Sequence, residues 1–250
     1  VVNQWTVDEI AKKRCDMVVM LNGLPVVVIE LKSATAENAT VEDAYKQIKN
    51  YQQVLPTLFA YNAFNVISDM GETKAGTLTA SLSRYMDWKT VDGNTESTLL
   101  VDYRTFFLGI FEKRRLLDIL QNFICFDKNQ GDIRKIMTAY HQYYAVNKAV
   151  ARTHIAVKGN GKIGVFWHTQ GSGKSLSMVF FAHQLIQQFP EVTIVVVTDR
   201  KDLDNQLYGQ FSRCQDFLRQ TPLNAGSREE LGELLRDRKS GGIIFTTIQK

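Results

Sequence analysis

Apolar residues in the first part of the chain form short β-like runs and one helical stretch. Residues 17–21 and 26–31 are apolar runs on either side of Asn22-Gly23, a dipeptide that favours a tight β-hairpin. Residues 40–55 predict a helix, because a capping-box pattern opens them and their apolar side chains recur at helical spacing. Further β segments are expected at residues 64–68, 76–82 and 88–91. The pattern predicts an α+β region with a mixed sheet.

The pattern changes after a very apolar helical stretch at residues 102–126 and a polar break at residues 127–132. Beyond the break, we predict helices at residues 136–157, 174–188, 201–218 and 227–238, and strands at residues 163–167, 192–198 and 242–248. Strands that alternate with helices favour a parallel sheet with right-handed crossovers. The chain is therefore predicted to be α/β with two domains, residues 1–127, ending in a helical connector over about 102–127, and residues 128–250.

The run His168-Thr169-Gln170-Gly171-Ser172-Gly173-Lys174-Ser175, between a predicted strand and a predicted helix, has the composition of a phosphate-binding loop. In such a loop, glycines let backbone N–H groups turn towards phosphate oxygens, a lysine adds positive charge, and a serine hydroxyl ligates Mg²⁺. The usual pattern has a glycine where this chain has His168. We expect ATP and Mg²⁺ to bind at Thr169, Gly171, Ser172, Gly173, Lys174 and Ser175. The alternative is a glycine-rich turn that binds no ligand.

A second candidate site lies in the predicted hairpin, where Asp16 begins one strand and Glu30 and Lys32 end the other. A two-residue turn would pair Asp16 with Ile29 and leave the carboxylates on opposite faces, whereas a longer loop or a bulge at Pro25 would pair Asp16 with Glu30. In the second register the two carboxylates can hold Mg²⁺, and Lys32 can orient water and stabilise charge on a phosphodiester. This is the chemistry of a metal-dependent nuclease. The alternative is a Glu-x-Lys pair that only shares one face of a strand.

Gln47 and Tyr51 lie one turn apart on the predicted helix over residues 40–55. From one helix face they can support metal ligands or contact the DNA backbone. The alternative is an exposed amide beside a core tyrosine.

The composition of the chain indicates the class of protein but does not identify a partner. The chain has 250 residues, 44% of them hydrophobic and 22% charged, which is typical of a soluble globular protein. No apolar run is long enough for a membrane span, so we expect a cytoplasmic protein without a membrane partner, and Val1 at the start suggests a piece of a longer chain. The net charge of +4 allows a polyanionic partner but does not require one. The three cysteines have no metal-type spacing and are expected to be small buried side chains.

The order of motifs resembles the motor (restriction, R) subunit of type I restriction enzymes. The resemblance rests on Asp16, Asn22-Gly23-Leu24-Pro25, Glu30-Leu31-Lys32, Gln47-x-x-x-Tyr51, Tyr140 to Ala145, His168 to Ser175, Asp199 to Asp204 and Thr246 to Lys250. It implies a PD-(D/E)xK nuclease domain with a restriction-endonuclease-like core, followed by the first RecA-like lobe of a superfamily 2 helicase motor.

The resemblance also implies roles for individual residues. Asp16, Glu30 and Lys32 match the nuclease triad, with Asp16 and Glu30 as metal ligands, and Gln47 with Tyr51 matches a Gln-x-x-x-Tyr motif of that nuclease group. Gln142 matches a glutamine that binds adenine, which suits an amide because it can donate and accept hydrogen bonds at once. Residues 198–203 and Thr246-Thr247 match motifs that contact the DNA backbone.

Three functions remain open from the sequence. The first is an ATP- and Mg²⁺-dependent endonuclease motor that pulls double-stranded DNA past methyltransferase (M) and specificity (S) subunits and cuts away from the recognition site. The second is a repair helicase fused to a nuclease. The third is a nucleotide-binding scaffold whose first domain only docks DNA or a partner subunit. The family's Asp-Glu box and second lobe would follow residue 250, so we expect these 250 residues alone not to translocate DNA.

Overall fold

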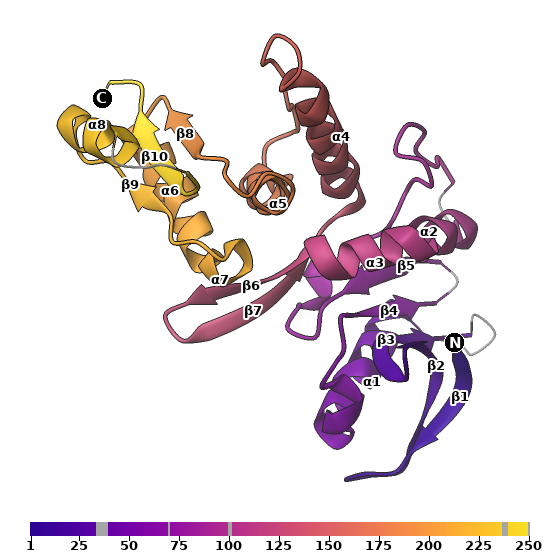
Figure 1. Ribbon diagram of the computed structural model, residues 1–250. Coiled ribbons are helices and arrows are strands. Elements are labelled where there is room, and N and C mark those ends of the chain that lie inside the picture. The colour runs from indigo at the N-terminus through magenta and orange to yellow at the C-terminus, as the bar shows by residue number, and fades with distance from the viewer. Residues whose placement is uncertain (34–39, 70, 100–101, 237–239, 250) are drawn as a thin grey trace. The chain divides into compact units, whose positions relative to one another are not determined.

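The computed structural model describes residues 1–33, 40–69, 71–99, 102–236 and 240–249. The chain is mixed α/β and divides into two compact units, which are described separately. Unit 1 contains Val1–Ile124 and Arg134–His141, and unit 2 contains Cys125–Ile133 and Gln142–Lys250. Each unit carries its own sheet (Figure 1).

Unit 1 is built on a five-stranded sheet whose strands follow the order of the chain. The strands are β1 (Val2–Val7), β2 (Lys13–Leu21), β3 (Leu24–Leu31), β4 (Phe64–Ser68) and β5 (Thr73–Gly76). Only β3 and β4 run parallel, and the other described neighbours are antiparallel, so the predicted mixed sheet is confirmed. β3 and β4 are buried along most of their length, which agrees with their nearly continuous apolar runs.

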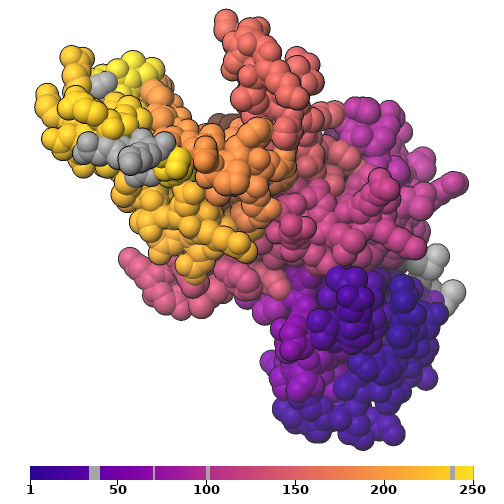
Figure 2. Space-filling model, viewed as in Figure 1, coloured from indigo at the N-terminus to yellow at the C-terminus, as the bar shows by residue number. Residues whose placement is uncertain are grey.

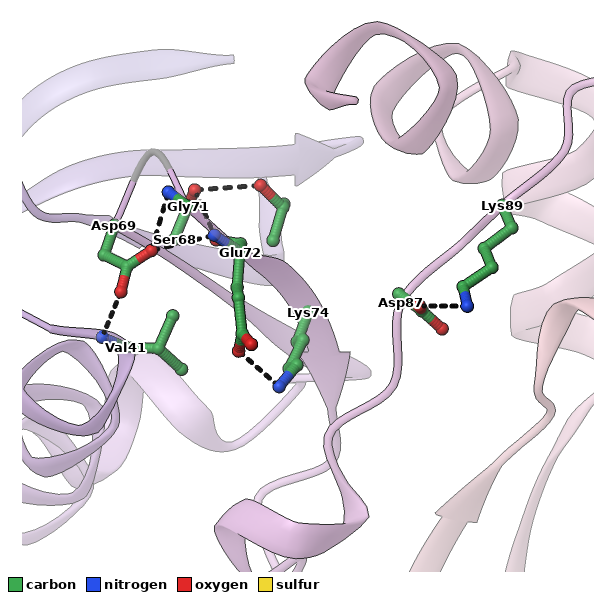
Figure 3. Close-up of polar contacts among 9 residues, drawn as sticks. Val41, Ser68, Asp69, Gly71, Glu72, Lys74, Asp87 and Lys89 are labelled. Carbon is green, nitrogen blue, oxygen red and sulfur yellow. Dashed lines mark hydrogen bonds and ion pairs between the residues drawn. The ribbon is translucent and has the colours of Figure 1, made fainter. Parts of the chain in front are cut away.

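Helix α1 (Val41–Val54) packs against this sheet and confirms the helix predicted over 40–55. Its first turn has the expected capping box, in which the Thr40 N–H donates to the Asp43 carboxylate at 3.2 Å. Asp69, just after β4, also accepts a hydrogen bond from the Val41 N–H at 2.9 Å (Figure 3). The helix start is therefore tied to the end of a central strand. The shared core of α1 and the sheet includes Val18, Val28, Ile67, Ala44, Ile48 and Tyr51.

The remaining segments of unit 1 differ in part from the prediction. The apolar connector forms two helices, α2 (Tyr103–Ile110) and α3 (Lys113–Asn122), while short 3-10 turns lie at η1 (Pro56–Phe59) and η2 (Leu82–Arg84). The β segments expected at 76–82 and 88–91 are wrong. β5 ends at Gly76, where a Cβ would overlap the ring of Tyr85, and the chain then turns. Residues 88–91 form no strand, and the ring of Trp88 packs closely on Gly109 of α2.

The polar break at residues 127–132 is a β-hairpin, formed by β6 (Ile124–Asn129) and β7 (Asp132–Met137). Gln130 and Gly131 have φ values of 45° and 91°, the left-handed conformation that a two-residue hairpin turn requires. Because the chain is still extended at residue 136, the helix predicted to begin there begins at Tyr140 instead. Sequence reasoning missed this hairpin because half of its strand residues are polar and polar residues surround its turn.

From residue 142 onwards unit 2 alternates helices and strands, and β8, β10 and β9 form a three-stranded sheet in that order, which is parallel as predicted. Its elements are α4 (Tyr140–Ala156), α5 (Lys174–Gln188), β8 (Ile194–Thr198), α6 (Lys201–Arg213), α7 (Gln215–Leu218), β9 (Leu223–Asn224), α8 (Arg228–Arg236) and β10 (Ile243–Thr247). The end of α4 and the turn after it stand out from the rest of the unit (Figure 2).

The strand predicted at residues 163–167 is wrong. The structure assigns no regular element there, and the side chains of Val165 and Trp167 are 96% and 77% exposed. A strand exists only where its backbone groups pair with a neighbour. Among the strands that the structure describes, none pairs with residues 163–167. The apolar run alone therefore misled the prediction.

Two further features follow from the composition. Cys15, Cys125 and Cys214 are buried free thiols, as expected for small core side chains. Among the described helices, none combines the length and apolar character needed to cross a membrane.

Candidate functional site

The register of the β2–β3 hairpin decides whether the two carboxylates meet. Asn22 and Gly23 have φ values of 49° and 83°, so the turn itself has two residues. The ladder pairs are Leu21 with Leu24 and Met20 with Pro25, then Val19 with Val27, Val18 with Val28 and Met17 with Ile29. Val26 is therefore an extra residue, a β-bulge beside Pro25. The irregular register is the one found, and the next positions beyond the last pair are Asp16 and Glu30.

Asp16 holds the end of this ladder with its side chain. Its Oδ2 accepts a hydrogen bond from the Leu31 N–H at 2.9 Å, and its Oδ1 accepts one from Nε2 of Gln4 at 3.3 Å. The carboxylate is thus oriented by donors from the strands on either side of β2. Gln4 was not among the residues predicted from the sequence, and no motif identifies it.

Glu30 forms an acidic cluster with Asp16 and Lys32. It is the buried residue of the three, with only 3% of its surface exposed. Its Oε1 accepts a hydrogen bond from Nζ of Lys32 at 2.7 Å, while its Oε2 is buried and has no hydrogen-bond partner among the described residues. Burial raises the pKa of Glu30, the hydrogen bond from Lys32 opposes the rise, and the charge of Asp16 adds to it. A buried carboxylate oxygen without a donor is costly, so this site suits a cation.

Helix α1 brings Gln47 and Tyr51 to the same place. The Tyr51 side chain is buried and its hydroxyl donates to the backbone carbonyl of Arg14 at 3.0 Å. Burial raises the pKa of Tyr51 well above its usual value, and hydrogen bonding to Gln47 opposes this rise, so the hydroxyl keeps its proton at neutral pH. The charge of Glu30 adds to the rise in the pKa of Tyr51, so this helix residue lies beside the acidic cluster.

The donor set indicates which metal the cluster can hold. No group of three or more His, Cys, Asp or Glu side chains suited to a metal ion occurs within the described residues. Asp16 and Glu30 offer two carboxylates, one of them with an unsatisfied oxygen. Mg²⁺ takes few protein carboxylates and keeps several waters, whereas zinc prefers a fuller set of nitrogen and sulfur ligands. The residues present therefore fit Mg²⁺.

The predicted phosphate-binding loop has the backbone conformation that its chemistry needs. Gly171 and Gly173 have φ values of 82° and 80°, and α5 begins directly afterwards at Lys174. The first N–H groups of a helix carry partial positive charge and suit an anion. Nζ of Lys174 donates to the backbone carbonyls of His168 and Thr169, both at 2.9 Å.

Gln142 of α4 lies against this loop. Its side chain is buried, and Nε2 donates to the carbonyls of Gly173 at 3.0 Å and Ser172 at 3.3 Å. A Cβ at Gly173 would overlap this amide nitrogen, so glycine is required there by both φ and close packing. Gln142 is thus brought to the loop, and its predicted contact with adenine stays a prediction. Ser172 also donates through Oγ to the Thr169 carbonyl at 2.8 Å, and Ser175 is half-buried in the first turn of α5.

The other predicted motor residues gather at the ends of β8 and β10. Asp204, buried in the first turn of α6, accepts hydrogen bonds from Oγ1 of Thr198 at 3.1 Å and from Nδ2 of Asn224 at 2.9 Å. Thr246 and Thr247 are buried at the end of β10, and their predicted contact with DNA stays a prediction. Lys250, which ends this motif, lies outside the described residues.

Two family models match the chain. The model for the N terminus of the type I restriction enzyme R protein matches residues 1–84, and the model for the SWI2/SNF2 ATPase matches residues 141–250. The first match includes all the residues of the acidic cluster, and the second includes the phosphate-binding loop.

Curated relatives match nearly the whole chain. The endonuclease subunit of the type I restriction enzyme HindI from Haemophilus influenzae is 43% identical over 248 residues, which are 96% of this chain and 23% of the relative. The endonuclease subunit of the type I restriction enzyme SauCOLORF180P from Staphylococcus aureus is 29% identical over 255 residues, which are 100% of this chain and 26% of the relative. The chain thus spans about a quarter of the length of these relatives.

Proposed function

The chain belongs to the family of type I restriction enzyme endonuclease subunits, and from this premise we propose that the protein is an ATP-dependent DNA translocase and Mg²⁺-dependent endonuclease. It would cut unmethylated foreign double-stranded DNA away from the recognition site, together with M and S subunits in the cytoplasm. Unit 1 would be the PD-(D/E)xK nuclease core and unit 2 part of the first RecA-like lobe. The observation that carries the proposal is the orphan Oε2 of Glu30 beside Asp16 and Lys32.

Each residue of the acidic cluster has a task that its geometry supports. Asp16 and Glu30 would hold Mg²⁺, which when bound lowers the pKa of water and neutralises charge on a phosphodiester. Lys32, fixed by its 2.7 Å contact with Glu30, would orient the attacking water and stabilise the charge that grows on the phosphate. Tyr51, whose hydroxyl donates to the Arg14 carbonyl, would with Gln47 fix helix α1 against β2 beside the metal ligands.

The phosphate-binding loop would supply the energy for translocation. Lys174 would leave the carbonyls of His168 and Thr169 and bind the β and γ phosphates of ATP, while Ser175 would ligate the Mg²⁺ that accompanies them. Gln142, whose amide lies against the loop, would bind adenine, because an amide can donate and accept hydrogen bonds at once. Base recognition would reside in the S subunit.

The test is plasmid cleavage by the full-length subunit assembled with M and S subunits, ATP and Mg²⁺. We expect Lys32→Ala to abolish cutting but to keep DNA-stimulated ATPase activity, and Lys174→Ala to abolish both. Lys46→Ala is the matched control for the first variant, because Lys46 on α1 is exposed and pairs with Asp43 outside the cluster. Lys162→Ala, in the exposed segment before the loop, is the control for the second.

The same assay separates the other functions. Normal cutting by Lys32→Ala would show that the hairpin is not the nuclease site. Absence of metal-dependent cutting by the wild-type subunit, despite normal ATPase activity, would favour a nucleotide-binding scaffold. Cutting by the wild-type subunit without M and S subunits would favour a repair helicase with a fused nuclease.

A further inference from the structure

The backbone of β1 is irregular at one residue, and that residue stands opposite Asp16. Asn3 pairs with Met17 and Trp5 pairs with Cys15, so the register places Gln4 across from Asp16. Gln4 has a φ of 53°, in the left-handed region, which non-glycine residues seldom adopt. Such outliers persist where the surrounding structure holds them and gather at functional sites.

β2 is also irregular at this point. Cys15 and Val18 are both fully buried in the same core, although residues three apart in a regular strand face opposite sides of a sheet. The strand therefore changes face between them, at Asp16 and Met17. Both β1 and β2 are therefore irregular beside the Asp16 carboxylate.

The side chain of Gln4 makes direct use of this deformation. Its Nε2 donates to Oδ1 of Asp16 at 3.3 Å, while the Leu31 N–H donates to Oδ2 at 2.9 Å. Two donors, one from each neighbouring strand, hold the plane of the carboxylate. Each oxygen still has a second lone pair for a cation.

Local stability does not explain the choice of Gln4. The residue is exposed, so it contributes little apolar burial, and a glycine would adopt its φ without strain. Its side-chain amide donates to Asp16. We propose that Gln4 is a positioning residue whose amide holds Asp16 in the orientation that binds the nuclease metal. This inference rests on the proposed nuclease function of the cluster.

The test measures metal binding directly, with Mn²⁺ as the probe and calorimetry of the full-length subunit in the absence of nucleotide, so that the phosphate-binding loop does not contribute. Gln4→Gly keeps the left-handed backbone but removes the amide. We expect it to weaken Mn²⁺ binding about tenfold, as removal of a residue that orients a metal ligand usually does, while the thermal midpoint of unfolding stays the same or rises. Asn3→Ala, at the neighbouring exposed position of β1, should bind Mn²⁺ as the wild type does.

A second variant tests the Mg²⁺ dependence of cleavage, which would not change if Gln4 only stabilised the fold. Gln4→Glu keeps the length of the side chain but replaces the amide with a carboxylate, which cannot donate to Asp16. In the assembled enzyme, DNA cleavage by Gln4→Glu should therefore need more Mg²⁺ than cleavage by the wild type. Gln4→Gly should lower cleavage at limiting Mg²⁺ and recover at high Mg²⁺.

The outcomes distinguish failure of this inference from failure of the proposed function. If Asp16→Asn loses Mn²⁺ binding and cleavage but both Gln4 variants behave as wild type, the positioning role is wrong and the nuclease site stands. If Asp16→Asn binds Mn²⁺ and cuts normally, the proposed site is wrong, and the role of Gln4 falls with it.

Discussion

The acidic cluster of unit 1 and the phosphate-binding loop of unit 2 are built in different ways. The cluster takes its groups from β1, β2, β3 and α1, and it depends on a bulge at Val26. The loop takes nearly all its groups from eight consecutive residues, and its conformation is set by two left-handed glycines and a helix start.

The difference predicts how each site fails. A contiguous loop is sensitive to changes of its own residues and tolerates distant ones, because its geometry is local. An assembled cluster is sensitive to any change that shifts one strand against another, because a slip of one residue turns every side chain to the opposite face. Substitutions can therefore be chosen to affect one site and leave the other intact.

The largest expected effect is the loss of ATP binding when either glycine of the loop is replaced. Gly171→Ala meets only backbone strain, since no atom lies within 4 Å of its added Cβ, whereas Gly173→Ala meets strain and overlaps Nε2 of Gln142. We expect Gly173→Ala to weaken ATP binding more than about tenfold and Gly171→Ala less than about tenfold, since about 1.4 kcal/mol is tenfold. Nucleotide titration of the full-length subunit measures both.

The double variant Gln142→Ala with Gly173→Ala sharpens this result. Removal of the amide leaves room for the new Cβ but not relief from backbone strain, so the loss relative to Gln142→Ala alone should shrink to about that of Gly171→Ala. Equal losses at the two glycines would contradict the close packing of Gln142 on the loop. Metal binding at the acidic cluster should not change in any of these variants.

A smaller effect is expected at the hairpin turn, far along the strands from Asp16. Gly23 has a φ of 83°, so Gly23→Ala should lower the free energy of unfolding by about 1 kcal/mol. Asn22→Gly is the matched control, because glycine accepts the left-handed conformation at that position. Chemical denaturation and plasmid cleavage measure the effect.

The Gly23→Ala variant also tests whether a change in the hairpin affects the acidic cluster without affecting the phosphate-binding loop. If the register is held by the turn, cleavage by Gly23→Ala should fall while ATPase activity stays at the wild-type level. A parallel fall of both activities would show that the change acts on the whole protein and not on the cluster.

The smallest expected effect is the dependence of stability and DNA cleavage on pH. Burial raises the pKa of Glu30, so between its ordinary and raised values the folded protein holds a proton that the unfolded chain has lost, and stability falls as pH rises through that window. Metal binding needs the ionised form and competes with the proton. We expect the acid limb of cleavage to lie above that of an ordinary glutamate and to move to lower pH as Mg²⁺ is raised.

Cleavage rates at two Mg²⁺ concentrations across the acidic range provide the measurement. DNA-stimulated ATPase activity at saturating Mg²⁺ is the internal control, because Glu30 is not part of the phosphate-binding loop. An acid limb that does not respond to Mg²⁺ would contradict the assignment of Glu30 as a metal ligand.

Local sequence determined the features that local interactions can fix. The capping box at Thr40 starts α1, the Asn22-Gly23 turn closes the first hairpin, and α5 begins at Lys174 and ends at Gln188 as predicted. Alternating helices and strands also predicted the parallel sheet of unit 2. In each case the energies come from neighbours in the chain, such as caps, left-handed residues and helical periodicity.

Only the tertiary structure decided the rest. Both hairpin registers were open to the sequence, and packing of the buried β3 run between β2 and β4 chose the one with a bulge at Val26. Residues 163–167 have the apolar pattern of a strand but no described partner, and the exposed Gln4 reaches Asp16 only because β1 lies beside β2. Strand pairing joins residues that are distant in the chain, so the free energy that selects among registers lies in contacts that no local pattern contains.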